Sequence, residues 1–206
     1  MKSIYSFVGA SMVFAAFASA QVLNGSFENN SGFVLTNASN ATYNANVSDS
    51  VQFGTAEETD LWDSSGFGMI TPWAGNWMVG MHNQGNGNAD SISLALASPL
   101  VVNQTYTLYF AAALYNAGWG GTFDIGTSSS ANSFGNYLVS ATPGSDSTWT
   151  LFGYSFTATS ADSYLTFTVA NGGGYAFLDA VSLTPTPGAA AVFGLAGLAA
   201  ARRRRA

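Results

Sequence analysis

The stretch SISLALA, residues 91–97, sets Ile92, Leu94 and Leu96 on one face of an extended chain. An apolar residue at every second position is the pattern of a β-strand with one buried face. The stretch TYTLYFA, residues 105–111, begins with the same alternation after a polar turn. These two stretches predict two neighbouring strands.

Towards the C-terminus, YLTFTV (164–169) and AFLDAVSL (176–183) carry further strand patterns. They are separated by NGGG (171–174), whose glycines can adopt positive φ, so the simplest interpretation is a hairpin. Additional strands are predicted at 149–157 and, from weaker patterns, at 22–27, 47–53, 78–81 and 122–125.

Short strands with frequent turns and no convincing helix predict an all-β fold. We expect one domain, a single jelly-roll β-sandwich over residues 21–184, between an N-terminal signal helix and a C-terminal hydrophobic helix. The chain has no Cys, which excludes disulfides, thiolate nucleophiles and zinc-thiolate sites. Stability must therefore come from an apolar core, for which Phe, Tyr and Trp are abundant.

The charges are distributed unevenly along the chain. Residues 21–184 contain all eleven Asp and Glu and no Lys or Arg, so the formal charge of this segment is −11 with His82 neutral. Nucleic acid is excluded as an expected partner, because binding a polyanion requires cationic side chains. Single carboxylates are either solvated surface groups or are compensated by a metal ion or a proton, and calcium is the metal expected outside the cell.

The N-terminal segment has the pattern of a secretory signal. Lys2 precedes a mostly apolar stretch at 4–17, and Ala18, Ser19 and Ala20 supply the small residues that signal peptidase needs. We therefore expect residues 1–20 to be a signal peptide and the mature chain to begin near Gln21.

The C-terminal segment combines a chain breaker, an apolar stretch and a positive cluster. Residues 188–201 are apolar on every helical face; at about 1.5 Å per residue they extend roughly 21 Å, against about 30 Å for a bilayer core. Positive charge after such a segment favours a topology with the body outside. The parts of this segment are Pro185, Thr186, Pro187 and Gly188, then the apolar stretch, then Arg202, Arg203, Arg204 and Arg205.

This order of parts, over residues 185–206, resembles the PEP-CTERM tail of bacterial surface proteins, with Thr186 where that family has Glu. The resemblance implies that an exosortase-type processing enzyme recognises the tail and that the apolar helix is transiently inserted in the inner membrane. It also implies removal of the tail and final placement at the cell surface or in the extracellular matrix.

The body resembles the galactose-binding-like jelly roll of many carbohydrate-binding modules. The likeness rests on NGSFE at 24–28, TYTLYF at 105–110 and FLDAVSL at 177–183. It implies a structural calcium on Glu28 and Asp179, with Ala180 where the family often has a second acid. Independently, the first and last strands of a sandwich can lie side by side, and two carboxylates brought together need a cation or a proton. The alternative is that both lie in water.

Sugar binding needs an aromatic face for the C–H side of a pyranose, with amide or carboxylate groups at its edge. Two segments, 73–77 and 115–121, combine aromatics with Asn and Gly, and extracellular polysaccharide is the expected partner. Any one of these aromatics can instead be a core residue. The candidate ligand-binding residues are Trp62, Trp73, Trp77, Tyr115, Trp119 and Tyr175.

Catalysis has little support in the sequence. A glycosidase needs two carboxylates across its cleft, whereas the acidic residues of 57–63 follow each other along the chain. His82 is the sole histidine and no Gly-x-Ser-x-Gly motif accompanies it. We expect a non-enzymatic surface module that binds carbohydrate; the alternatives are a structural matrix protein without a ligand site and, as a weaker case, a glycoside hydrolase.

Overall fold

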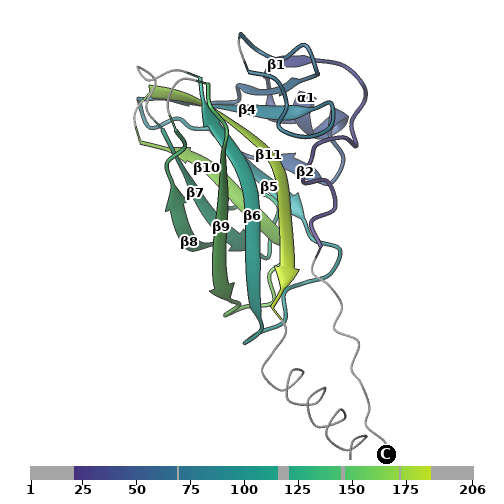
Figure 1. Ribbon diagram of the computed structural model, residues 1–206, viewed down its shortest axis with the longest axis vertical. Helices are drawn as coiled ribbons and strands as arrows, with labels where there is room; N and C mark the ends of the chain where they lie inside the picture. The colour runs from purple at the N-terminus through teal and green to yellow at the C-terminus, as the bar shows by residue number, and fades with distance from the viewer. Residues whose placement is uncertain (1–20, 69, 116–120, 145–146, 172, 187–206) are drawn as a thin grey trace, which may run out of the picture.

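The computed structural model describes residues 21–68, 70–115, 121–144, 147–171 and 173–186, and over these the chain is a β-sandwich of two antiparallel sheets (Figure 1). The predicted all-β sandwich is thus confirmed. The predicted signal peptide at 1–20 and the tail from Pro187 onward lie outside the described residues. Within the described part of the chain, no helix is long and apolar enough to cross a membrane.

One sheet has six strands and carries the features that matter for the site. The long last strand, β11, lies at its centre between β4 and β6. In spatial order the strands are β1 (Leu35–Ala38), β3 (Thr59–Trp62), β4 (Met78–Gln84), β11 (Gly173–Pro185), β6 (Thr105–Leu114) and β9 (Thr150–Thr157).

The other sheet has five strands and closes the sandwich from the opposite side. Its order is β2 (Ser50–Gln52), β5 (Ser91–Ala95), β10 (Tyr164–Ala170), β7 (Thr122–Ser128) and β8 (Asn136–Ala141).

Two predicted strand pairings are wrong. The strand at 91–97 and the strand at 105–111 belong to different sheets, β5 pairing with β2 and β10 while β6 pairs with β11 and β9. Likewise β10 and β11 do not form a hairpin, since β10 belongs to the five-stranded sheet and β11 to the six-stranded sheet. Alternation predicts which face of a strand is buried, but both sheets bury their inner faces in the same core, so it cannot predict the partner.

The expectation of no helix is also corrected by one short element, α1 (Asn40–Asn46). Ser39 caps it by accepting a hydrogen bond from the backbone N–H of Thr42. Its buried residue is Tyr43, whose hydroxyl bonds to that of Ser50. A single buried apolar residue leaves no 3.6-residue pattern, which explains why the sequence did not predict the helix.

The core between the sheets is aromatic. Phe167 of β10 lies 5.5 Å from Phe110 of β6 and 6.3 Å from Phe123 of β7, measured between ring centroids. All three are buried, at the angles that edge-to-face packing prefers.

A second, smaller apolar cluster lies on the outer face of the six-stranded sheet. Its buried members are Ile70, Met78, Ala113, Tyr175 and Phe177. Tyr175 and Phe177 alternate along β11 with Ala176 and Leu178; of these four, only the latter two belong to the main core. The sheet is therefore apolar on both faces at this end. Residues 63–68 and 70–77, named here the covering loop, supply Phe67 and Ile70 to this outer cluster.

Candidate functional site

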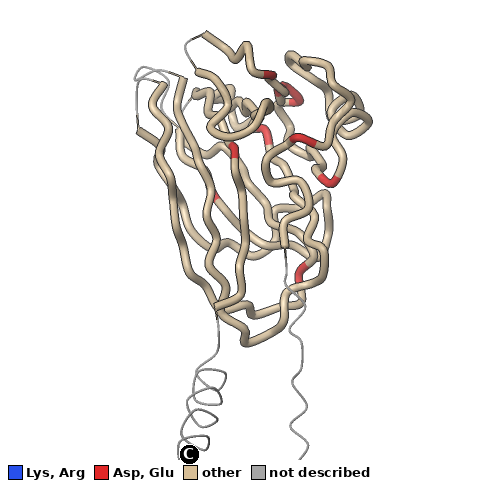
Figure 2. Tube along the Cα trace, turned by 45° about the vertical axis from the view of Figure 1, so that its right-hand side comes forward, with Lys and Arg blue, Asp and Glu red and all other residues tan. Residues whose placement is uncertain are grey.

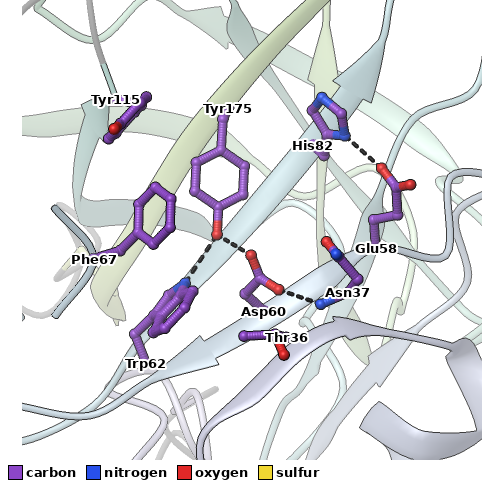
Figure 3. Close-up of a pocket in the computed structure, with 9 residues that line it drawn as sticks. All are labelled: Thr36, Asn37, Glu58, Asp60, Trp62, Phe67, His82, Tyr115 and Tyr175. Atoms are coloured by element: carbon purple, nitrogen blue, oxygen red, sulfur yellow. Dashed lines mark hydrogen bonds and ion pairs between the residues drawn. The ribbon is translucent and has the colours of Figure 1, made fainter.

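A pocket of about 390 Å³ opens beside this outer cluster (Figure 3). Aromatic side chains lie on one side of it and polar side chains on the other, with Tyr175 between them. Strands β1, β3, β4 and β11, the covering loop and the residue after β6 all contribute. The lining residues are Thr36, Asn37, Glu58, Asp60, Trp62, Phe67, His82, Tyr115 and Tyr175.

Phe67 is the centre of the aromatic side. Its ring centroid lies 4.9 Å from that of Trp62, 5.0 Å from that of Tyr115 and 5.4 Å from that of Tyr175. Trp62, Phe67 and Tyr115 are only partly buried, so the pocket leaves part of this aromatic surface accessible.

Tyr175 joins the two sides through its hydroxyl. Trp62 Nε1 donates a hydrogen bond to this hydroxyl at 2.9 Å, and the hydroxyl donates to Asp60 Oδ2. The phenol reaches Asp60 because Gly80 leaves the space that it crosses: a Cβ at position 80 would lie 2.2 Å from the Tyr175 hydroxyl oxygen. Any larger residue at position 80 would displace this side chain.

Asp60 is a buried carboxylate with neutral partners. Its Oδ1 accepts the backbone N–H of Asn37 at 2.5 Å, and Asn37 has a positive φ of 46°. Burial raises the pKa of Asp60, and the hydrogen bonds from Tyr175 and Asn37 oppose that rise. These donors fix the carboxylate at the base of the pocket.

Glu58 and His82 form the polar side. His82 Nδ1 lies 2.5 Å from Glu58 Oε2, and both side chains are partly exposed. The hydrogen bond with His82 lowers the pKa of Glu58. Behind them Asp90 accepts the backbone N–H of Glu58 at 3.0 Å and that of His82 at 2.8 Å, and burial raises its pKa to about 6.

A second pair of carboxylates anchors the covering loop. Glu28 Oε1 accepts the backbone N–H groups of Asn76 at 2.7 Å and Trp77 at 2.9 Å, while Asp179 Oδ2 accepts that of Ala74 at 2.9 Å. Gly75 is required between them, because its φ is 69° and a Cβ there would lie 2.3 Å from Glu28 Oε1. The predicted strand at 22–27 does not form, since Val22 makes only an isolated bridge to Leu96. This segment nevertheless contacts the last strand, where Val181 N donates a hydrogen bond to Gly25 O at 2.8 Å.

Calcium on Glu28 and Asp179 stays a prediction. Two carboxylates supply fewer oxygens than the six to eight that calcium takes, so carbonyls or water would have to complete the shell. Among the described residues, no group of three or more His, Cys, Asp or Glu could hold a metal ion. The loop N–H groups compensate the same two carboxylates.

The structure brings three of the six candidate aromatics together: Trp62, Tyr115 and Tyr175 line one pocket. Trp73 belongs to the covering loop, is 47% exposed and does not line the pocket. Its ring centroid lies 6.5 Å from that of Trp149. Trp77 is partly buried and packs against the main core, and Trp119 lies outside the described residues.

The remaining lining residues were not predicted from the sequence as binding residues. Glu58, Asp60 and Trp62 occupy alternate positions, which place them on one face of an extended chain, and this spacing was the available signal. Phe67 and His82 had no comparable signal. Thr36 and Asn37 belong to a strand that was not predicted.

Comparison with known proteins gives the fold class. The K1 cleaved adhesin domain of Lys-gingipain from Porphyromonas gingivalis W83 matches at a TM-score of 0.54 and 15% identity, covering 82% of this chain and 99% of that one. The CBM22-1–GH10 modules of a Clostridium thermocellum endo-1,4-β-D-xylanase, complexed with xylohexaose, match at a TM-score of 0.51 and 13% identity. The match covers 82% of this chain and 29% of that one.

The module TmCBM61, in complex with β-1,4-galactotriose, matches at a TM-score of 0.48 and 14% identity, covering 80% of this chain and 97% of that one. No family model matches the chain, and no curated protein matches it. At such identities the likeness shows the fold: the body is a β-sandwich of the kind found in adhesin domains and carbohydrate-binding modules.

The first prediction concerns pH and stability. Burial raises the pKa of Asp179 from its ordinary 3.8 to about 7, and the nearby charge of Glu28 acts in the same direction. Between these pH values the folded protein keeps a proton that the unfolded chain has released, so the free energy of unfolding falls as pH rises from 4 to 7. Asp179→Asn should reduce this slope in urea titrations carried out in EDTA.

The control for this prediction is Asp49→Asn, which removes the same charge from an exposed position. It should leave the slope as it is in the unsubstituted protein. A slope that survives in Asp179→Asn would contradict the assignment of the raised pKa to this carboxyl.

The second prediction tests the calcium site. A cation shared by Glu28 and Asp179 would stabilise the folded state by mass action, so chelation with EDTA should lower the melting temperature. Glu28→Gln should remove this sensitivity. An unchanged thermal midpoint in EDTA, measured by differential scanning calorimetry, would show that no such ion contributes.

Proposed function

We propose that this protein is a non-catalytic carbohydrate-binding module and that the pocket lined by Trp62, Phe67 and Tyr115 is its binding site. The observation that carries the proposal is the division of the pocket into an accessible aromatic side and a polar side (Figure 3). A pyranose has the same division, with C–H groups on its faces and hydroxyls around its edge.

The geometry supports this assignment in size and chemistry. At about 390 Å³ the pocket lies near the lower end of the range for small-molecule sites, about 300–1,000 Å³, which suits one or two sugar units. The rings of Trp62 and Phe67 offer an apolar face to the C–H groups. Glu58, His82 and Asn37 place polar groups where the hydroxyls would lie.

A non-enzymatic role fits the arrangement of the acidic residues. Glu58 and Asp60 lie two positions apart on one chain segment and face the same side, whereas a glycosidase needs carboxyl groups that flank the scissile bond. Asp60 is also engaged by Tyr175 and Asn37. The gingipain adhesin domain, matched over 99% of its length, shares the fold.

We further propose that the protein is exported and reaches the cell surface or extracellular matrix through exosortase-type processing. The signal-like segment 1–20, the tail 185–206 and a body without Lys or Arg support this proposal. The partner would then be an extracellular polysaccharide.

The third prediction tests sugar binding. Trp62→Ala should weaken binding to the best ligand of a glycan array by at least about tenfold, or roughly 1.4 kcal/mol, because the sugar loses part of its apolar platform. Tyr115→Ala, at the opposite end of the aromatic side, should weaken it as well. Isothermal titration calorimetry provides the affinities, and circular dichroism verifies that each variant is folded.

Trp73→Ala is the matched control, because this exposed Trp lies outside the pocket. Retained binding in this variant supports the pocket as the site; loss of binding only here would transfer the site to the covering loop. A folded protein that binds no glycan would favour a structural matrix role instead.

The fourth prediction tests export. Mass spectrometry of the protein isolated from its native cells should show loss of residues 1–20 and of the apolar segment with its four arginines. A protein that keeps Met1, or one that keeps Arg202–Arg205, would contradict the corresponding step of processing.

A further inference from the structure

The pocket combines several carboxylates with an absence of fixed positive charge. Glu58 and Asp60 line it and Asp90 lies directly behind Glu58 and His82. The described residues include no Lys or Arg, and Figure 2 shows most acidic positions in the half of the body that contains β1 and α1. His82 is the one side chain here that can become cationic in the described part of the chain.

These carboxylates repel one another. The charge of Glu58 raises the pKa of Asp60, after the larger effect of burial, and the charge of Asp60 acts on Asp90 in the same way. Asp60 and Asp90 accept hydrogen bonds from neutral donors, which do not cancel the repulsion. Glu58 is paired with His82, and the charge of His82, when it is protonated, lowers the pKa of both Glu58 and Asp90. A cationic group in the pocket would interact favourably with all three.

We propose that the pocket prefers sugars carrying a free amino group, that is, hexosamine units of a de-N-acetylated polysaccharide, over neutral sugars, and that it rejects uronic-acid and sulfated glycans. The proposal rests on the carbohydrate-binding function and specifies its ligand class. The protonated amine would lie beside the partly exposed Glu58, while the sugar ring lies against Trp62 and Phe67.

Shape and charge both contribute to this selection. An aromatic platform alone accepts neutral sugars and amino sugars alike, because both have the same C–H faces. Like charges brought together without a counterion are strongly unfavourable, so an anionic sugar beside Glu58 and Asp60 would be excluded. The carboxylates therefore set the specificity and the aromatics supply the common apolar surface.

The fifth prediction compares three oligosaccharides of equal length by calorimetry with the full-length folded protein: glucosamine, N-acetylglucosamine and galacturonic acid trimers. The glucosamine trimer should bind at least about tenfold more tightly than its acetylated counterpart, and the galacturonate trimer should show no binding. The advantage of the amine should shrink when NaCl is raised from 25 to 250 mM, because salt screens charge interactions at an exposed site.

Glu58→Gln and Glu57→Gln form a matched pair of variants. They remove the same charge from adjacent positions, but only Glu58 lines the pocket, while Glu57 is exposed and hydrogen-bonded to Asn40. The ratio of glucosamine to N-acetylglucosamine affinity should fall several-fold in Glu58→Gln and stay unchanged in Glu57→Gln. Thermal midpoints verify that both variants are folded.

The outcomes separate the two proposals. Binding of N-acetylglucosamine or another neutral oligosaccharide without preference for the amine overturns the amino-sugar inference and leaves the binding function intact. An equal fall of the ratio in both variants shows attraction by overall charge and overturns the role of Glu58. A folded protein that binds none of these trimers, and no other glycan, overturns both proposals.

Discussion

Burial of the large side chains on the outer face of β11 is the constraint on which the rest of the site depends. Tyr175 and Phe177 point away from the main core, so the six-stranded sheet has apolar surface on both faces at one end. Burying a side chain of this size is worth about 1.5–3 kcal/mol. The covering loop buries this outer apolar surface with Phe67 and Ile70. The same packing leaves the aromatic side of the pocket partly exposed.

Carboxylates hold this arrangement in place without basic side chains. Glu28 and Asp179 accept hydrogen bonds from backbone N–H groups of the covering loop. Asp60 accepts hydrogen bonds from the Tyr175 hydroxyl and from the backbone N–H of Asn37. Burial raises the pKa of Asp60 and Asp179, and their neutral donors only partly oppose that rise. Stability and the charge of the pocket therefore depend on the same few acidic groups.

The fold class was predictable because the period-two patterns at 91–97 and 164–169 reflect burial of one strand face, which is a local property. The strand partners could not be predicted from the sequence, because pairing depends on segments far apart in the chain. Trp62, Tyr115 and Tyr175 were predictable as candidates because they are aromatic residues beside glycine or polar residues. Phe67 and His82 were not predictable from the sequence. Phe67 is placed by its packing against Trp62, Tyr115 and Tyr175, and His82 by the strand register that sets it opposite Tyr175.

The described residues include no Lys or Arg, and this charge imbalance links the proposed sugar binding to the proposed class of sugar. A module with this charge would repel acidic glycans at long range, so contact with polysaccharide requires a neutral or cationic polymer. Within the pocket, the neutral donors Tyr175 and Asn37 do not cancel the charge of Asp60, and an arriving ammonium group would do so. The carboxylates that repel one another in the free protein would then stabilise the complex with an amino sugar, and this difference between the free and bound states would produce the proposed selectivity.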